Sequence, residues 1–239
     1  MNVVESKVKV IHLPKMNRLQ PSRYFRHLSV PPDILQELAE VHHDPQLWWI
    51  GQVESYIFRP NPAVQKFIED RTKLLHFGSP IVGVHIRRSD KIKEASYQSL
   101  FSYIRHVREF YDRQFTNKNL TRKVFLATDT PKMLFKARRK YLDLEFLGDV
   151  EVSRSAGRMS TRHSDVALRD VITDLHLLSR SDFLVCTFSS NMCRAAYEMM
   201  QAAADGDASR RVKSLDKPLY WDLDRLFRKK KKILEYKYL

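Results

Sequence analysis

Basic side chains follow directly after a short apolar segment that has the length of a β-strand. The segment is Ile81–Ile86, and the cations after it are Arg87, Arg88 and Lys91. His85, inside the segment, points to the same side as Arg87. An arginine can hold two phosphate oxygens, and a second cation can stabilise the charge of a departing group. This spacing favours an anion site that takes part in group transfer, and a solvated charged loop is the alternative.

Hydroxyl groups and an acid follow two other strand-like segments. Ser189 and Ser190 come after Asp182–Cys186 and before a helix. Hydroxyls and free backbone N–H groups at a helix start can bind an anion. Asp129 comes after Val124–Ala127, also just before a helix. The simpler role of an N-cap is the usual one for an acid such as Asp129, and Ser189 or Ser190 could cap the helix and bind an anion together.

Asp174 lies between Val171 and Leu178, on the otherwise apolar face of a predicted helix. Carboxylates are rarely buried without a partner. In this place a carboxylate could recognise a ligand edge that is rich in hydrogen-bond donors, such as the N1–H and 2-amino groups of guanine. The alternative is an acid on the helix surface near Arg169 or Arg180.

The elements that position these residues alternate between strand and helix from Pro80 onward. A helix after Ser96, with apolar positions from Tyr97 to Tyr111, separates the first two strands. The later segments are a helix to Arg139, a strand at Leu144–Leu147, a loop at Ser153–His163, a helix from Ser164 or Asp165 to about Arg180, and a helix at Ser190–Ala203. This alternation predicts a parallel sheet with helices on its faces, where ligands bind beyond the carboxyl ends of the strands.

Three parts of the chain differ in composition. Residues 1–78 hold seven of the ten prolines and two short helical patterns, Pro32–Val41 and a helix from Asn61 toward Leu75. We interpret this part as an incomplete helical segment that leans on another structure. Residues 79–221 form the predicted nucleotide-binding domain, and residues 222–239 form a basic tail that includes Arg228–Lys232.

The charge of the chain points to an anionic partner. It has 239 residues, a formal net charge of +14 and a pI near 9.8. Nucleic acid, a nucleotide or sugar phosphate, a sulfated glycan and an acidic membrane would all fit. The sequence lacks an apolar run of ~20 residues and the apolar core of a signal peptide, so we expect no signal or membrane anchor in this chain.

Several functional classes lack their sequence signatures. No Walker A loop or G-x-G-x-x-G motif is present. No cluster has convincing zinc spacing, so no metal site is predicted. Zinc-finger and RNA-recognition signatures are also missing, which argues against a nucleic-acid partner. Cys186 and Cys193 are the only cysteines, and the residues alone allow either two buried thiols or a local disulfide.

Three segments together resemble the α-1,6-fucosyltransferases that add core fucose to N-glycans. They are Gly83–Lys91, Phe125–Asp129 and Asp182–Glu198, and the last is long and highly specific. Pro45–Ile50, which ends near Trp48 and Trp49, is also similar. The resemblance runs from about residue 20 to about Tyr220. It implies an α/β fold with a Rossmann-like parallel sheet, the nucleotide half of a GT-B-like enzyme, after an incomplete Pro-rich helical segment.

The resemblance implies an inverting transferase that uses GDP-fucose without a metal or other cofactor and acts on the 6-hydroxyl of the innermost GlcNAc of an N-glycan. The residue roles that it implies are guanine recognition by His85 and Asp174, diphosphate binding by Arg87, Arg88, Ser189 and Ser190, acid–base catalysis by Lys91 and Glu94, and acceptor-side positions at Tyr103, Asp129 and Asp216. Glu94 would take the proton of the acceptor hydroxyl, since inversion needs a base opposite the leaving group. The resemblance also implies a Cys186–Cys193 disulfide, the Golgi lumen and a dimer of the full-length protein.

This sequence departs from the family pattern near the implied base. Only Ile92 and Lys93 separate Lys91 from Glu94, which is one residue fewer than in the family. Asn191 stands where the family has Gln. We also expect a catalytic region only, truncated at both ends, without the family's anchor, stem and SH3-like domain. The alternative function is therefore an impaired fragment or paralogue that binds nucleotide or polyanions without turnover.

Overall fold

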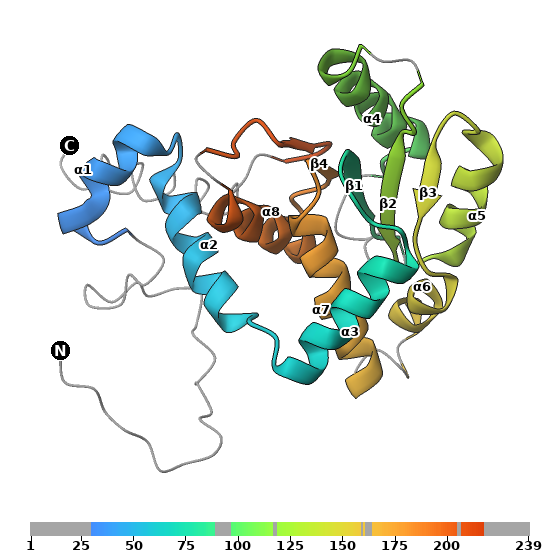
Figure 1. The fold of residues 1–239 in the computed structure, drawn as a ribbon, viewed down its shortest axis with the longest axis horizontal. Helices are drawn as coiled ribbons and strands as arrows, with labels where there is room; N and C mark the ends of the chain where they lie inside the picture. Colours follow the sequence, from blue (N-terminus) through green and yellow to red (C-terminus); the bar gives the residue numbers. More distant parts are fainter. Residues whose placement is uncertain are drawn as a thin grey trace, which may run out of the picture.

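The computed structural model describes residues 30–88, 97–116, 119–158, 160, 164–204 and 207–217. Figure 1 shows the order of the elements along the chain. The helices are α1 (Pro32–Val41), α2 (Pro45–Ile57), α3 (Pro62–Leu74), α4 (Leu100–Gln114), α5 (Pro131–Lys140), α6 (Val150–Gly157), α7 (Asp165–Ser179) and α8 (Asn191–Ala203). The strands are β1 (Ile81–Ile86), β2 (Lys123–Thr128), β3 (Glu145–Leu147), β4 (Phe183–Cys186) and β5 (Val212–Ser214).

The five strands form one parallel sheet in the order β3-β2-β1-β4-β5. This is the order of a Rossmann-type sheet, and the direction of winding reverses between β1 and β4. The α/β prediction is therefore confirmed, including the short third strand. β5 was not predicted, because only three residues pair there and their sequence, Val-Lys-Ser, lacks an apolar run.

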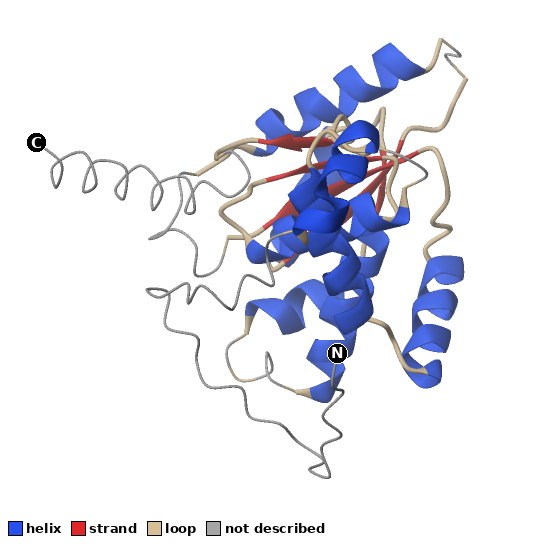
Figure 2. Ribbon diagram, turned by 90° about the vertical axis from the view of Figure 1, so that its left-hand side faces the viewer, coloured by secondary structure: helices blue, strands red, loops and turns tan. Residues whose placement is uncertain are grey.

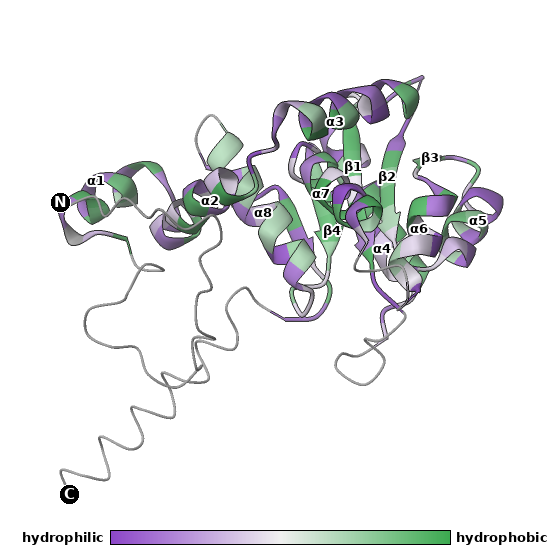
Figure 3. Ribbon diagram, turned by 90° about the horizontal axis from the view of Figure 1, so that it is seen from below, coloured by the Kyte–Doolittle hydropathy of each residue, from purple (hydrophilic) through white to green (hydrophobic). Residues whose placement is uncertain are grey.

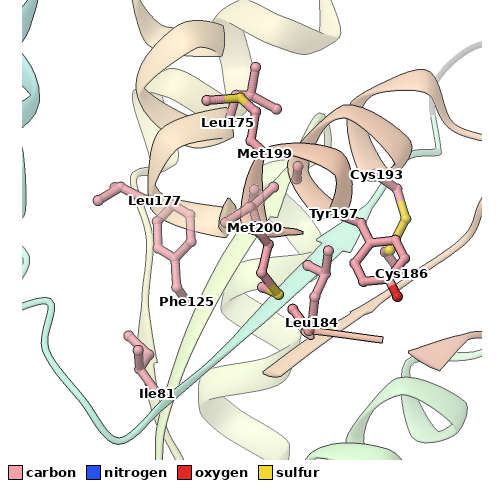
Figure 4. Packing of buried hydrophobic residues seen from close by; sticks show 14 of the residues in the cluster. Ile81, Phe125, Leu175, Leu177, Leu184, Cys186, Cys193, Tyr197, Met199 and Met200 are labelled. Carbon is pink, nitrogen blue, oxygen red and sulfur yellow. A yellow bond between two sulfur atoms is a disulfide. The ribbon is translucent and has the colours of Figure 1, made fainter. Parts of the chain in front are cut away.

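Helices cover both faces of this sheet (Figure 2). Because side chains alternate along a strand, Val82 and Val84 of β1 pack with α4 and α5 on one face, whereas Ile81 packs with α7 and α8 on the other. All six residues of β1 are buried, and Figure 3 shows the strands as the most hydrophobic elements. Figure 4 shows the core on the α7 and α8 side of the sheet, which includes Ile81 and Phe125.

The N-terminal helices pack against the outer side of α7 and α8. Figure 1 shows α2 alongside α8 and α3 beside α7, and both pairs are in contact. Leu47 of α2 is only 1% exposed and belongs to the same core as Tyr197 of α8. Helices α2 and α3 of this segment thus lean on the α/β part of the same chain. The boundaries at 78/79 and 221/222 stay predictions, and residues 222–239 lie outside the described ranges.

Two local predictions were wrong. Helix α4 begins at Leu100, and Ser99 caps it by accepting a hydrogen bond from the Ser102 N–H at 3.1 Å. Tyr97 and Phe101, predicted as core positions, are 69% and 57% exposed. The predicted Ser153–His163 loop begins inside α6, because Asp149 caps two backbone N–H groups there and favours a helix despite the polar sequence.

The disulfide implied by the family resemblance is present. Cys186 ends β4 and Cys193 lies in the first turn of α8, with their Cα atoms 6.0 Å apart. Figure 4 shows the two sulfur atoms beside Tyr197. The bond ties the end of β4 to α8, so it fixes the intervening turn that carries Ser189 and Ser190. No helix in the described ranges combines the length and the apolar character that a bilayer crossing requires.

Candidate functional site

A cavity of about 180 Å³ lies at the carboxyl edge of the sheet. It is bounded by the ends of β1 and β2, by α6 and α7, and by the first turn of α8. Its lining residues are His85, Arg87, Ala127, Thr128, Asp129, Val152, Ser155, Ala156, Ala167, Asp170, Val171, Asp174 and Met192. This is where ligands bind in open parallel α/β sheets, near the point at which the strand order reverses.

Gly83 lets α7 approach β1 closely. A Cβ atom at residue 83 would lie 2.7 Å from Ser181 Oγ and 3.2 Å from the Leu178 side chain. Only a residue without a side chain leaves room for this approach. His85, two residues later on the same face of β1, is thereby brought to the cavity wall that α7 also supplies.

His85 is a neutral imidazole at physiological pH. Its side chain is buried, with a relative exposure of 5%. Burial lowers the pKa of His85 to about 4; the charge of Arg87 acts in the same direction and the charge of Asp129 acts against it. Nδ1 has no hydrogen-bond partner among the described residues. A neutral imidazole offers one donor and one acceptor, so it can read a polar ligand edge.

Asp174 faces the cavity and is half-buried. Desolvation by burial raises the pKa of Asp174 to about 7, and the charge of Asp170 adds to this effect. The alternative was an acid on the helix surface near Arg169 or Arg180, but the charges that act on Asp174 are those of Asp170, Arg71 and Asp149. A carboxylate that is costly to ionise gains most from a ligand that donates hydrogen bonds to it.

Arg87 and Arg88 point in different directions after β1. Arg87 lines the cavity. Arg88 is not among the lining residues: its guanidinium stacks on the Tyr97 ring at 3.9 Å and donates to the carbonyl of Gln98. Its backbone N–H donates to Asp129 Oδ1 at 2.8 Å, so Asp129 holds the first turn after β1 in place.

Helix α8 begins at the cavity without a side-chain cap. Ser190 is the N-cap residue and is 1% exposed, yet its side chain accepts no capping hydrogen bond and its Oγ has no partner among the described residues. No acidic residue lies in the first turn, whereas Met192 lines the cavity. Within the described ranges, no side chain caps the first N–H groups of α8, and such groups at a helix start can bind an anion. Ser189 lies in the same turn.

Two of the three predicted acceptor-side residues, Tyr103 and Asp216, form a second group at the same edge, on the side of α4. Tyr103 is buried, which raises its pKa to about 12, and its side chain is hydrogen-bonded to Thr187. The charge of Asp216 also reaches this hydroxyl. Asp216 Oδ1 accepts from Ser214 Oγ at 3.1 Å, and its buried Oδ2 has no partner among the described residues.

The structure thus brings His85, Arg87, Asp129 and Asp174 together around one cavity. Asp129 was predicted as an acceptor-side residue, and its place in the cavity wall is nearer to the predicted donor residues. Lys91 and Glu94 lie outside the described residues. Sequence reasoning missed Asp170, although its position one helical turn before Asp174 was a usable signal.

Unpaired buried polar atoms gather at this edge of the sheet. Within the described ranges, His85 Nδ1, Arg88 Nε, Ser190 Oγ and Asp216 Oδ2 are buried and have no hydrogen-bond partner. Buried polar groups are normally paired, so such a group of exceptions calls for a ligand or ordered water. In the same ranges, no group of three His, Cys, Asp or Glu side chains could hold a metal ion.

Comparisons with known proteins give a consistent result. Residues 2–220 match the family model described as the N- and catalytic domains of alpha-(1,6)-fucosyltransferase. The chain is 43% identical over 215 residues to an alpha-(1,6)-fucosyltransferase of Drosophila melanogaster, covering 89% of this chain and 34% of that protein. It is 33% identical over 220 residues to one of Caenorhabditis elegans, covering 90% of this chain and 39% of that protein. The chain therefore spans little more than a third of the length of the curated relatives that it matches.

Among solved structures, the chain is similar to the NodZ alpha-1,6-fucosyltransferase co-crystallised with GDP. The TM-score is 0.37 and the identity 19%, with 58% of this chain and 41% of that chain covered. The same enzyme soaked with GDP-fucose gives a TM-score of 0.36 at 17% identity, with 58% of this chain and 42% of that chain covered.

Proposed function

The chain belongs to the alpha-(1,6)-fucosyltransferase family, and we propose that its carboxyl-edge cavity binds GDP-fucose as the donor for transfer to an N-glycan. The acceptor group is the 6-hydroxyl of the innermost GlcNAc, and the transfer inverts the configuration at the fucose carbon. One observation carries the donor assignment: neutral His85 and the hard-to-ionise Asp174 face the same cavity, beside Arg87 and the uncapped start of α8.

Guanine suits the two polar side chains on the cavity wall. Its N1–H and 2-amino groups are adjacent donors, and the two oxygens of the Asp174 carboxylate can accept both hydrogen bonds. His85, as a neutral imidazole, can donate to the carbonyl oxygen or a ring nitrogen of the same base. Adenine presents a different edge, with only its 6-amino group as a donor and an acceptor at N1, so it would place an acceptor against one oxygen of the Asp174 carboxylate.

The diphosphate requires positive charge, which several groups near the cavity supply. Arg87 lines the cavity and can hold two phosphate oxygens. Ser189, Ser190 and the first N–H groups of α8 offer further donors, and the helix dipole favours an anion there. Arg88 adds positive charge next to the cavity, because its backbone N–H is bonded to Asp129 while its guanidinium stacks on Tyr97. We propose that these cations stabilise the departing GDP in place of a metal ion, so that no metal cofactor is needed.

The proton transfer falls to Lys91 and Glu94, by resemblance to the family. Glu94 removes the proton from the attacking hydroxyl while the bond from the fucose carbon to the diphosphate oxygen breaks, and GDP leaves with both electrons of that bond. Tyr103 and Asp216 stand on the acceptor side of the same edge, where a sugar hydroxyl would find a buried acceptor oxygen.

The family also supports the remaining assignments. The Golgi lumen is the proposed compartment, and the Cys186–Cys193 disulfide is in keeping with a secretory lumen. We propose that the full-length protein dimerises, as its family does. The impaired, turnover-free alternative rests on the shortened spacing between Lys91 and Glu94. A fucosyl-transfer assay with an N-glycan acceptor separates the two, since only an active enzyme releases GDP together with a fucosylated product.

Titration calorimetry of GDP in the presence of a chelator tests the donor site. We expect micromolar binding that is lost in Arg87→Ala and Asp174→Asn and retained in Arg108→Ala. Arg108 is the control because it pairs with Asp143 at 2.7 Å on the protein surface and does not line the cavity. A folded wild-type protein that bound no GDP would refute the donor assignment. Binding that fell steeply with salt and ignored Arg87→Ala would instead favour a polyanion surface.

A further inference from the structure

An arginine outside the cavity is tied to the wall of the cavity. Arg71, near the end of α3, pairs with Asp149, with Nη2 and Oδ2 2.6 Å apart. The two side chains are only 17% and 28% exposed. Asp149 is also the N-cap of α6, where its other oxygen accepts from the Glu151 and Val152 N–H groups at 2.7 and 3.1 Å. Because α6 supplies Val152 and Ser155 to the lining, Arg71 is joined to the cavity through Asp149.

The same arginine acts on two further carboxylates. Asp170 and Asp174 lie one turn apart on α7, and both line the cavity. The positive charge of Arg71 lowers the pKa of each, against the effect of burial, which raises both. The charge of Asp170 raises the pKa of Asp174. Arg71 is thus a cation shared by three carboxylates.

The elements packed on α7 carry further charged or titratable groups. Beyond the cluster they are His85 and Arg87 at β1, Asp129 after β2, Arg194 and Glu198 on α8, and Arg169 and His176 on α7 itself. The charges that shift the pKa of Asp174 are those of Asp170, Arg71 and Asp149, in decreasing order of effect. His85 stays neutral above pH ~5, since its pKa is about 4.

We propose that Arg71 is a positioning residue for donor binding: it holds Asp149 and, with Asp170 opposing it, sets the charge of Asp174, so that affinity for a guanine nucleotide rises with pH. This inference rests on the proposed binding of GDP. An ionised Asp174 accepts two hydrogen bonds from guanine, whereas a protonated one turns an O–H toward a donor edge and loses at least one of them. The N-terminal helices thereby take part in nucleotide binding without touching the nucleotide.

The size of the effect follows from the ionised fraction. With a pKa of about 7, half of Asp174 is ionised at pH 7, and the apparent dissociation constant for GDP is twice its limiting value. If loss of the Arg71 charge raised this pKa by about one unit, only about one molecule in eleven would be ionised, and binding at pH 7 would weaken about fivefold. Removing the Asp170 charge would lower the pKa and tighten binding up to about twofold.

The test compares the GDP dissociation constant between pH 5.5 and 8.5 for the wild type, Arg71→Gln, Arg71→Lys and Asp170→Asn. Lys66→Gln is the matched control, because Lys66 is an exposed cation on the same helix that pairs with Asp70 at 3.5 Å. Ionisation of the GDP phosphate is common to all variants and cancels in the comparison. The pKa of Asp174 is read separately, without nucleotide, from the carboxyl ¹³C shift of labelled aspartate, assigned with Asp174→Asn.

We expect the midpoint of the pH profile for GDP binding to be higher than in the wild type for Arg71→Gln and lower for Asp170→Asn. For Arg71→Lys and Lys66→Gln it should equal the wild-type value. The midpoint of the Asp174 ¹³C titration, measured without nucleotide, should shift in the same direction as the binding midpoint in each variant. A uniform weakening of GDP binding by Arg71→Gln at every pH would mean a merely structural role and would overturn the inference while leaving the donor site standing. A folded wild type that bound no GDP at any pH would overturn both.

Discussion

Substituting Gly51 by alanine tests how closely α2 must approach α8. Gly51 is a buried residue in the middle of α2. A Cβ atom there would lie 2.9 Å from the carbonyl carbon of Glu198, closer still to its oxygen, and 3.4 Å from Cβ of Ala202. The Glu198 carbonyl belongs to the backbone of α8, so it cannot rotate out of the way as a side chain would. Gly51→Ala therefore forces the two helices apart.

The expected change in the free energy of unfolding for Gly51→Ala follows from two opposing effects. Alanine favours a helix interior over glycine by about 1 kcal/mol. Overpacking a close contact costs about 1–3 kcal/mol, and a rigid backbone neighbour places this case at the upper end. The net change should be a loss of about 1–2 kcal/mol in the free energy of unfolding. The sign is thus opposite to the one that helix propensity alone predicts.

Urea unfolding followed by circular dichroism measures this change. Gly78→Ala is the control, since no heavy atom lies within 4 Å of a Cβ built at that residue, and we expect a change within about 0.5 kcal/mol. If Gly51→Ala were instead as stable as the wild type or more stable, the close packing of α2 on α8 would be refuted. The unfolding slope should stay unchanged, because the surface exposed on unfolding is nearly the same.

Three further changes have defined outcomes. Burial and the neighbouring Glu198 raise the pKa of Glu54 to about 8 from an ordinary 4.5, so its contribution to stability is present below pH 4.5 and is lost as the pH rises to about 8. In denaturation from pH 5 to 9, Glu54→Gln should gain on the wild type with rising pH by about 1–2 kcal/mol after allowance for solvent screening, and parallel curves would contradict this. Tyr111→Phe should cost about 1–2 kcal/mol in the same measurement, because its buried hydroxyl donates to backbone carbonyls 2.7 and 3.0 Å away; an unchanged midpoint would argue against those bonds. Replacing both Cys186 and Cys193 by serine should lower the thermal midpoint and weaken GDP binding, because the turn that carries Ser190 loses its tether; unchanged GDP affinity would show that packing alone holds the turn.

Periodicity made most of the fold predictable. The apolar runs at Ile81–Ile86 and Asp182–Cys186 became central strands, because a strand buried on both faces must be apolar throughout. Helix starts were found where Asn61 and Ser164 cap the backbone, since capping depends on neighbouring residues only. The prediction failed at α6 and β5, where short polar segments take their conformation from the elements beside them.

The meeting of the strand-end residues at one cavity was predictable for a similar reason, whereas their roles stay predictions. Parallel strands end at one edge, so residues directly after β1 and β2 had to meet there. Asp170 was missed because the apolar residue one turn before it, Val166, is itself exposed, so this face of α7 gives no clear burial pattern. Arg71 carried no signal, since it lies on another helix of ordinary composition.

The sequence by itself determined the strand–helix order, the family and the chemical types of the groups at the strand ends, because these depend on local pattern and on residue identity. Only the tertiary structure decided the state and the surroundings of those groups. Burial keeps His85 neutral and makes Asp174 costly to ionise, and the packing of α3 on α7 places Arg71 beside three carboxylates. Desolvation and charge–charge interaction depend on distances between segments far apart in the chain, which no local pattern contains.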